Sequence, residues 1–365
     1  MDWPFINDWT WTAQVYITLH TLALLMKMHS YAFYNGHLSE TQRRLRALDN
    51  PSTASRESAY RYPTTVTGPY NDTGSEEREK EDVGTLREDL AMELISPLGR
   101  ATYPQNLTAW NFCDYLLCPT LCYELEYPRT EKIQWTELIA KTLAVFGCIF
   151  LLTITSEEFI LPVMIDSAAR LEHVESLSET ALILAESISL LLFPFMITFL
   201  LVFLVIFEYV LGAFAEITCF ADRHFYSDWW NSTDWLEFSR EWNIPVHHFF
   251  RRHVYGASRR HLSRPMATLI TFLISAIAHE LVMACITKKV RGFGLVAQMM
   301  QLPIVLVQRT KWVKGKKVFN VSMLSKRHGA SEILKLAIAE CVFLDLYDTR
   351  SLDGEFHAPV NSRLP

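Results

Sequence analysis

The sequence predicts an all-α membrane protein that crosses the bilayer several times. Of its 365 residues, 50% are hydrophobic and only 20% are charged, which is below the quarter usual in soluble domains. The mean hydropathy is only +0.10, because long apolar runs alternate with long polar stretches. The run from Ile188 to Val210 carries one charge, Glu208. This run argues against the alternative, a large soluble protein with buried helices.

Five apolar runs approach the roughly 20 residues that a membrane-spanning helix needs. We expect them to be the spans, and they cover residues 11–34, 138–154, 181–217, 266–286 and 293–307. The first is unusually polar, since it contains Lys27 and His29. The third is too long for one untilted span, so we expect a long kinked helix or two pieces that meet at Pro194. The fifth is shorter and is interrupted by Pro303.

Long polar segments between these runs set the expected organisation of the chain. After a first membrane-helix region at residues 1–37, we expect a largely disordered cytosolic loop at 38–95, because its middle is rich in Ser, Thr, Pro and charge. Residues 96–317 form the expected core. Its helices are expected at about 138–160, 181–217, 266–287 and 293–308, with a polar segment at 218–264. Residues 318–365 form an atypical tail.

The positions of Lys and Arg predict the orientation in the membrane. Basic residues are dense in 218–264 and 309–317, whereas only Arg170 lies between the second and third runs. Five spans place both basic stretches, together with residues 35–137, on the cytosolic side. The sequons at Asn71, Asn106 and Asn231 would then stay unglycosylated.

Composition also excludes several classes of protein. The net charge of −6 argues against a nucleic-acid binder. The seven cysteines are scattered without a CxxC pair, so we expect neither a disulfide framework nor a zinc site. The start, MDWPFINDW, lacks the basic region of a cleavable signal peptide. Internal segments must therefore drive membrane insertion.

The fourth run places His279 inside an apolar helix. A charged His is costly there, so we expect a neutral side chain against a cavity or a partner. It could be a general base that activates a substrate hydroxyl or a structural His that bonds a neighbouring helix. Ser275 lies one turn earlier on the same face, whereas Glu280 is offset by about 100° and faces elsewhere. The sequence has no Gly-x-Ser-x-Gly elbow, so Ser275 is a poor nucleophile.

The second candidate cluster is FYSDWWN at residues 225–231, just after the third run. Paired Trp residues at a helix end are typical of an interfacial belt. The density of Trp and His in the next 20 residues argues for a binding site as the alternative to a belt. Asn231 offers both a donor and an acceptor, which suits the holding of a carbonyl or a hydroxyl.

These elements resemble the sterol O-acyltransferase branch of the membrane-bound O-acyltransferases, and the fungal enzymes most of all. The resemblance rests on FYSDWWN, on the NST and NIPVHHFF that follow it, and on SAIAHEL in the fourth run. Further matches are MKMHSYAFYNG at 26–36, CPTLCYELEYPRT at 118–130 and VFGCIFLL at 145–152. The similarity runs from about residue 3 to about residue 317.

The resemblance implies transfer of a long-chain acyl group from acyl-CoA to the 3β-hydroxyl of a sterol, in the endoplasmic reticulum membrane. The implied fold is a helical bundle with an internal reaction chamber. His279 falls on the family's catalytic His and Asn231 on its catalytic Asn. The implied substrate-binding positions are Trp230, Tyr226, Asp228 and Ser275. The implied reaction needs no metal and no cofactor, acyl-CoA being a co-substrate, and family members assemble as dimers or tetramers.

The chain departs from the family at both ends. The family has further membrane helices before the start and a last hydrophobic helix after Lys317, so we expect this chain to be truncated at both ends. Two other functions stay open. The first is a diacylglycerol O-acyltransferase, which shares FYxDWWN and PTLCYELxxPR-like elements. The second is a non-catalytic partner of a full-length homologue, an interpretation that the missing end helices favour. A transporter would not explain FYSDWWN.

Overall fold

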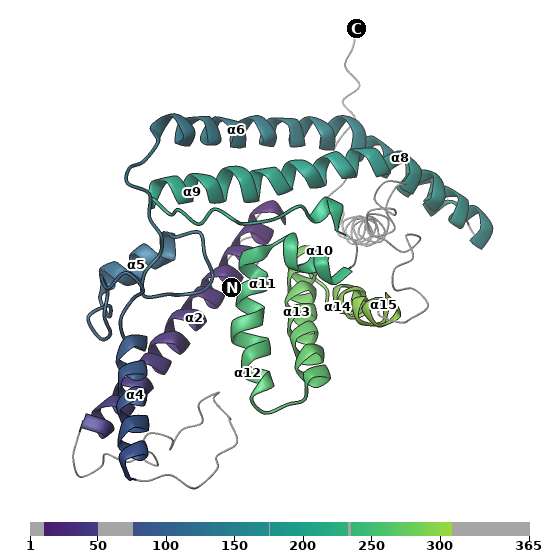
Figure 1. Cartoon of the computed structure of the whole chain (residues 1–365). Helices are drawn as coiled ribbons and strands as arrows, with labels where there is room; N and C mark the ends of the chain where they lie inside the picture. The colour runs from purple at the N-terminus through teal and green to yellow at the C-terminus, as the bar shows by residue number, and fades with distance from the viewer. Residues whose placement is uncertain (1–10, 50–75, 175, 233–234, 309–365) are drawn as a thin grey trace.

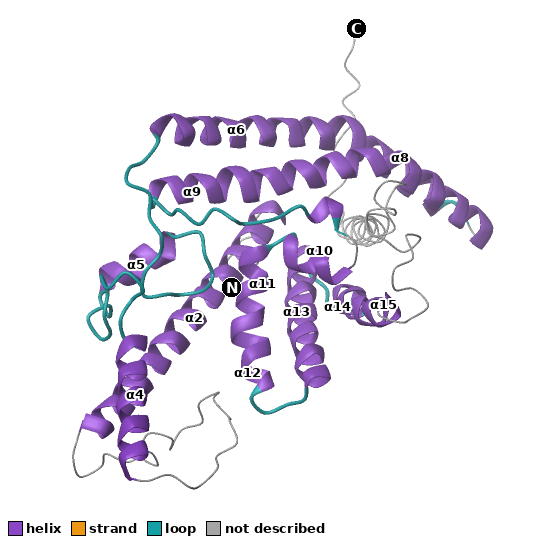
Figure 2. Cartoon of the chain, viewed as in Figure 1, coloured by secondary structure: helices purple, strands orange, loops and turns teal. Residues whose placement is uncertain are grey.

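A computed structural model describes residues 11–49, 76–174, 176–232 and 235–308 of the chain. These residues form helices and loops, with isolated β-bridges and no strand in the described ranges (Figure 2). The predicted all-α class is confirmed. The tail at 318–365 lies outside the described residues.

Two long antiparallel helices form one layer of the molecule (Figure 1). The first runs through α6 (Trp135–Ile154), the π-helix η1 (Thr155–Ile160) and α7 (Leu161–Glu172). The second runs through α8 (Leu177–Phe203), the π-helix η2 (Leu204–Val210) and α9 (Leu211–Ile217). Polar pairs hold both ends of this hairpin. Lys141 lies 3.5 Å from Glu208 at one end, and Arg170 lies 2.8 Å from Glu186 at the other.

The helix does not break at Pro194, which lies inside α8. The chain instead widens into a π-helical turn at η2, ten residues further on. Of the two alternatives expected for this run, the single long helix is therefore the one found. The wide turn carries Glu208, and Gly212 in α9 leaves room for the Lys141 side chain, since a Cβ there would lie 2.9 Å from Nζ.

Three described helices are long and apolar enough to cross a membrane, namely Trp135–Glu172, Leu177–Ile217 and Arg264–Cys285. The expected first and fifth spans are not among them. The first run belongs to α2 (Trp11–Asp49), whose polar side chains Gln14, Lys27 and Ser30 are buried against protein. The fifth run is split into α14 (Phe293–Met299) and α15 (Gln301–Gln308), and each is too short to cross.

The range 38–95, expected to be largely disordered, is helical at both ends. Helix α2 continues to Asp49, and residues 76–93 form α4 (Glu76–Glu93). The two helices pack through Leu48 and Leu90, and Arg87 pairs with Asp49 at 2.6 Å. Helix–helix packing supplies the stability that composition alone does not indicate. The middle, 50–75, lies outside the described residues.

The chain segments before α6 and after α9 meet at one end of the hairpin. Thr130 N donates to the Cys219 carbonyl at 2.7 Å, and Ala221 N donates to the Pro128 carbonyl at 2.9 Å. This contact agrees with the expectation that 35–137 and 218–264 share one side of the membrane. Asn106 in the first segment is buried, and its Nδ2 donates to Asn35 Oδ1 at 2.8 Å. That nitrogen is therefore enclosed in the core and not presented for glycosylation.

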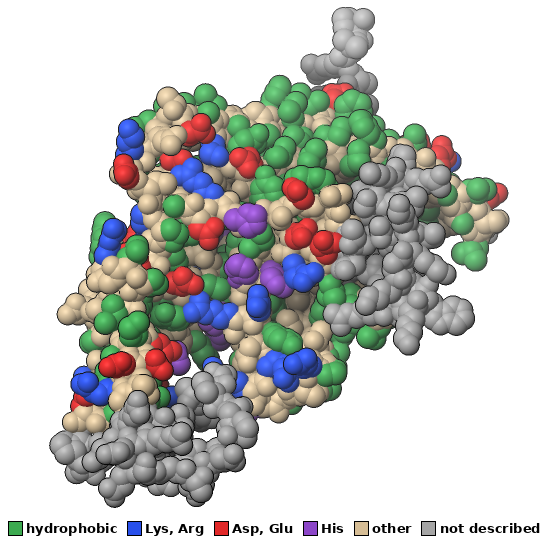
Figure 3. Space-filling model, in the orientation of Figure 1, with side chains coloured by type: hydrophobic (Ala, Val, Ile, Leu, Met, Phe, Trp, Pro, Cys, Tyr) green, Lys and Arg blue, Asp and Glu red, His purple; other side chains and the backbone are tan. Residues whose placement is uncertain are grey.

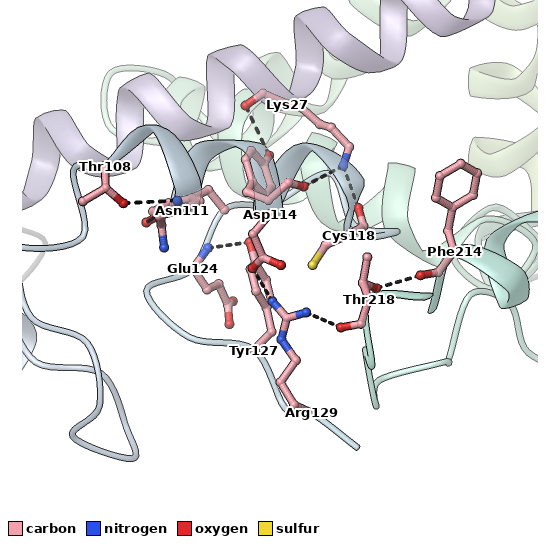
Figure 4. A network of polar contacts seen from close by, with 12 residues as sticks. Lys27, Thr108, Asn111, Asp114, Cys118, Glu124, Tyr127, Arg129, Phe214 and Thr218 are labelled. Atoms are coloured by element: carbon pink, nitrogen blue, oxygen red, sulfur yellow. Dashed lines mark hydrogen bonds and ion pairs between the residues drawn. The ribbon is translucent and has the colours of Figure 1, made fainter. Parts of the chain in front are cut away.

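The buried ammonium of Lys27 joins α2 to α5 (Ala109–Leu117), as Figure 4 shows. It donates to the carbonyls of Tyr115, Leu116 and Cys118 at 3.0, 2.9 and 2.6 Å. The last carbonyls of a helix have no partner within the helix, and a cation at this end also favours the helix dipole. Lys27 thus fixes the end of α5, from which the CPTLCYELEYPRT element continues.

The CPTLCYELEYPRT element contacts the segment after α9 through Arg129. Its guanidinium donates to Asp114 on α5 and to the carbonyl of Thr218 after α9, each at 2.5 Å (Figure 4). Around these contacts lies an aromatic core to which the first half, the hairpin and the motif segment all contribute. Its buried members are Tyr115, Cys118, Tyr123, Tyr127, Phe203, Phe207, Ala215, Phe220 and Phe225.

We expect Lys27→Met to destabilise the fold. The thioether fills a similar volume but removes the ammonium donor from the carbonyls of Tyr115 and Leu116, while the Cys118 carbonyl keeps the N–H of Thr120 at 2.8 Å. Each group that stays unpaired costs about 1–3 kcal/mol. Membrane accumulation and protease resistance should both fall. The matched control is Lys132→Met, because Lys132 is exposed. Equal accumulation and resistance of both variants would contradict the role given to Lys27.

Candidate functional site

The FYSDWWN motif lies on the aromatic core, where Trp229 packs against the core and the neighbouring Trp230 is exposed. Phe225 is buried, and the Trp229 ring meets Phe203 edge to face at 5.2 Å. The chain then forms a single 3-10 turn, η3 (Trp229–Asn231). Trp230 is 53% exposed, and among the described residues its ring meets the Trp229 ring edge to face at 5.8 Å. The first Trp therefore holds the motif, and the second is open to a ligand.

Tyr226 ties the motif to the membrane hairpin. Its hydroxyl donates to Glu208 Oε2 at 3.0 Å, while Glu208 Oε1 faces Lys141 Nζ at 3.5 Å. Burial raises the pKa of Tyr226, and the hydrogen bond to Glu208 raises it further. The hydroxyl is committed to this contact, so its role in the described structure is to position the motif.

Asp228 and Asn231 are both exposed. The backbone N–H of Asn231 donates to the Asp228 carbonyl at 2.8 Å, which closes the turn. Neither side chain makes a hydrogen bond within the part of the chain that the structure describes. Both the Asn231 amide and the Asp228 carboxylate are thus able to bind a ligand.

Helix α13 (Arg264–Thr287) carries the second cluster. His279 Nδ1 lies 2.8 Å from the carbonyl oxygen of Ser275. A carbonyl only accepts, so Nδ1 carries the hydrogen and Nε2 presents its lone pair. The imidazole is exposed in this structure and is not enclosed as the sequence predicted. Its tautomer nevertheless suits a base that works through Nε2.

Glu280 points away from His279, as the helical offset predicts. The carboxylate is buried and accepts from the backbone N–H groups of Arg291, Gly292 and Leu295 at 3.1, 2.6 and 3.1 Å. It therefore fixes the start of α14. At Gly294 a Cβ would lie 3.2 Å from this carboxylate, so glycine permits the close approach of α14 to α13.

The six predicted site residues fall into two clusters. Residues 226–231 lie at the aromatic core, whereas Ser275 and His279 lie on α13. No hydrogen bond joins the two clusters in the described ranges. They are linked indirectly, because α10 (Trp235–Glu241) contacts α15, α15 contacts α14, and α14 packs along α13.

A third group, around His253, was not assigned by the sequence. Histidines gather among Lys and Arg on the face below the hairpin (Figure 3). His253 lies in the π-helix η4 (Phe250–Tyr255), and its Nε2 is 2.8 Å from the Oγ of Ser30. The Ser30 hydroxyl also accepts from Tyr123 N at 2.8 Å. Ser30 is completely buried, which makes this pair a structural link and not a nucleophile.

Burial, together with the nearby His29 and Arg252, lowers the pKa of His253 to about 4. The pair joins MKMHSYAFYNG to the segment after NIPVHHFF. The sequence signal for it was the position of His29 and Ser30 within the matched element, but nothing in the spacing identifies His253 as the partner.

Comparison with known proteins gives consistent matches. The model of the membrane-bound O-acyltransferase family matches residues 5–323. A probable sterol O-acyltransferase 2 of Schizosaccharomyces pombe is 41% identical over 312 residues, which is 85% of this chain and 61% of that protein. Sterol O-acyltransferase 2 of Candida albicans is 33% identical over 345 residues, 85% of this chain and 54% of that protein.

A diacylglycerol O-acyltransferase 1 of Dictyostelium discoideum is also similar. It is 34% identical over 238 residues, which is 65% of this chain and 37% of that protein. The chain thus spans little more than half the length of the first two relatives.

The His253–Ser30 pair predicts a loss of stability in acid. The unfolded His titrates near its usual pKa of about 6.5, and the folded one at about 4. Between these values the unfolded chain binds more protons, so stability falls as the pH drops through this window. His253→Gln should flatten part of this dependence of the thermal midpoint between about pH 6.5 and 4. An unchanged slope in the variant would contradict the assignment.

Proposed function

The chain belongs to the membrane-bound O-acyltransferase family, and from this premise we propose that it transfers a long-chain acyl group from acyl-CoA to the 3β-hydroxyl of a sterol. The observation that carries the proposal is the His279 tautomer, with Nδ1 bound to the Ser275 carbonyl and Nε2 free. The similarity to two fungal sterol O-acyltransferases supports the choice of acceptor. The product would be a sterol ester in the endoplasmic reticulum membrane.

In this mechanism neutral His279 acts as the general base. Nε2 takes the proton of the sterol hydroxyl while the oxygen attacks the thioester carbonyl carbon. The tetrahedral intermediate collapses with loss of the CoA thiolate, which takes up the proton from Nε2. The groups present in the chain suffice for these steps, and we propose that no cofactor takes part.

Asn231 would orient the acyl carbonyl and donate to the oxygen on which charge develops. Its amide is exposed and unpaired within the described residues. Trp230 supplies an exposed apolar surface beside it, and Asp228 lies at the start of the same turn. Tyr226 would act at a distance, because its hydroxyl is used by Glu208.

The similarity to a diacylglycerol O-acyltransferase favours a second candidate acceptor, diacylglycerol. The base and the acyl donor would be the same in both reactions. Microsomes that contain the chain should therefore be assayed with labelled acyl-CoA and each acceptor in turn. Sterol ester supports the proposal, triacylglycerol supports the second candidate, and no ester supports a non-catalytic role.

We expect His279→Ala to abolish sterol esterification while the protein still accumulates in membranes. The imidazole is exposed and its loss leaves no buried group unpaired. The control is Thr268→Ala, a half-buried position on the same helix whose hydroxyl donates to the Arg264 carbonyl of that helix at 3.0 Å. Wild-type rates for His279→Ala, measured as labelled sterol ester per unit of protein, would remove His279 from the mechanism.

Asn231→Ala should lower the rate of ester formation by at least an order of magnitude, since one donor to a developing oxyanion is commonly worth about 10²–10³ in rate. Asn231→Asp tests the donor separately, because a carboxylate only accepts. Unchanged rates in both variants would assign the motif to the interfacial belt. Accumulation in membranes should match the wild-type chain in both cases.

A further inference from the structure

The hydroxyl of Ser275 differs from the other hydroxyls of α13. Thr268 and Thr271 donate to the carbonyls four residues earlier, at 3.0 and 2.7 Å. The Ser275 Oγ instead lies 3.3 Å from Nε2 of Gln298, on α14. No atom of the described ranges accepts the Ser275 hydroxyl hydrogen.

A second amide fixes the direction of Gln298. Its Oε1 accepts from Nε2 of Gln301 at 2.7 Å. Since the carbonyl end is used there, the NH₂ end faces Ser275 and can only donate. Ser275 Oγ is therefore the acceptor in this contact, and its own hydrogen points elsewhere. Both Gln side chains are half-buried, which limits their freedom to turn.

Ser275 and His279 are one turn apart on the same face of α13. This face thus presents a hydroxyl donor and, beside it, the basic Nε2. We propose that the Gln298 amide positions the Ser275 hydroxyl as a hydrogen-bond donor to the acyl carbonyl oxygen, next to the Nε2 that takes the sterol proton. This inference rests on the proposed function and assigns Gln298 as a positioning residue.

The step balances without a further reactant. The sterol proton moves to Nε2, the new carbon–oxygen bond forms, and the carbonyl electron pair moves onto the oxygen. Ser275 donates a hydrogen bond to this oxygen and keeps its proton. The carbon–sulfur bond then breaks, and the thiolate removes the proton from Nε2. Ser275 is thus a donor and not a nucleophile, in agreement with the missing Gly-x-Ser-x-Gly elbow.

A double-mutant cycle tests whether Gln298 acts through Ser275. Ser275→Ala should lower kcat by about 10²-fold. Gln298→Met, which keeps the length and removes the amide, should lower kcat by about tenfold as a part of that effect. KM for acyl-CoA should change less than about twofold in both, because the contact forms with the developing charge.

The double variant should be no slower than Ser275→Ala alone. A further tenfold loss in the double variant, or wild-type kcat for Gln298→Met, would overturn the proposal. Met300→Ala is the matched control, since this neighbour is 52% exposed and should keep the wild-type kcat.

A readout that needs no acyl transfer tests the contact itself. In the Ser275→Cys chain, a donor from Gln298 would stabilise the thiolate and lower the pKa of the thiol. Adding Gln298→Met should slow alkylation at position 275 by iodoacetamide about threefold or more, as followed by peptide mass spectrometry. Met300→Ala should leave that rate unchanged.

An unchanged alkylation rate with Gln298→Met overturns the contact and the proposal with it. If alkylation slows but the wild-type chain forms no ester with either acceptor, the proposed function fails. The catalytic role of Ser275 then fails too, although the contact stands.

Discussion

The buried ammonium of Lys27 is the contact on which the arrangement depends. It ends α5 by binding three carbonyls, and the segment that leaves this point carries Tyr123, Tyr127 and Arg129. Tyr123 binds Ser30, and Arg129 binds the segment after α9. One side chain on α2 thus anchors the CPTLCYELEYPRT element, which leads into α6 and contacts the segment after α9. FYSDWWN follows in that segment.

The site residues are placed by protein contacts that the motif itself does not contain. Glu208 projects from the wide turn of η2 to meet Tyr226, and Glu280 binds the start of α14 with three backbone N–H groups. These contacts leave the Trp230 ring and the Asn231 amide free at one cluster. At the other, the turn from Ser275 to His279 presents a donor and an acceptor on one face. The proposed acyl transfer would depend on such positioning, because the base and the hydrogen-bond donors must meet the reacting atoms in one geometry.

Much of this was predictable from residue patterns. The apolar runs gave the hairpin and α13, and the i to i+4 spacing placed Ser275 with His279 and turned Glu280 away. The number of spans was not predictable, because the sequence does not show that the polar residues of α2 are buried against other parts of the protein. Lys27 and Ser30 bond groups about 90 residues away. The contact of Gln298 with Ser275 was not predictable either, since it depends on how closely Gly294 lets α14 approach α13.

The most direct test of the account is the identity of the acyl acceptor. The purified chain should be placed in liposomes that hold a sterol and diacylglycerol at equal mole fractions, and labelled acyl-CoA added. Sterol ester should be the dominant labelled product, and it should disappear in the His279→Ala chain. Triacylglycerol as the dominant product, or ester formation that survives the loss of His279, would contradict it.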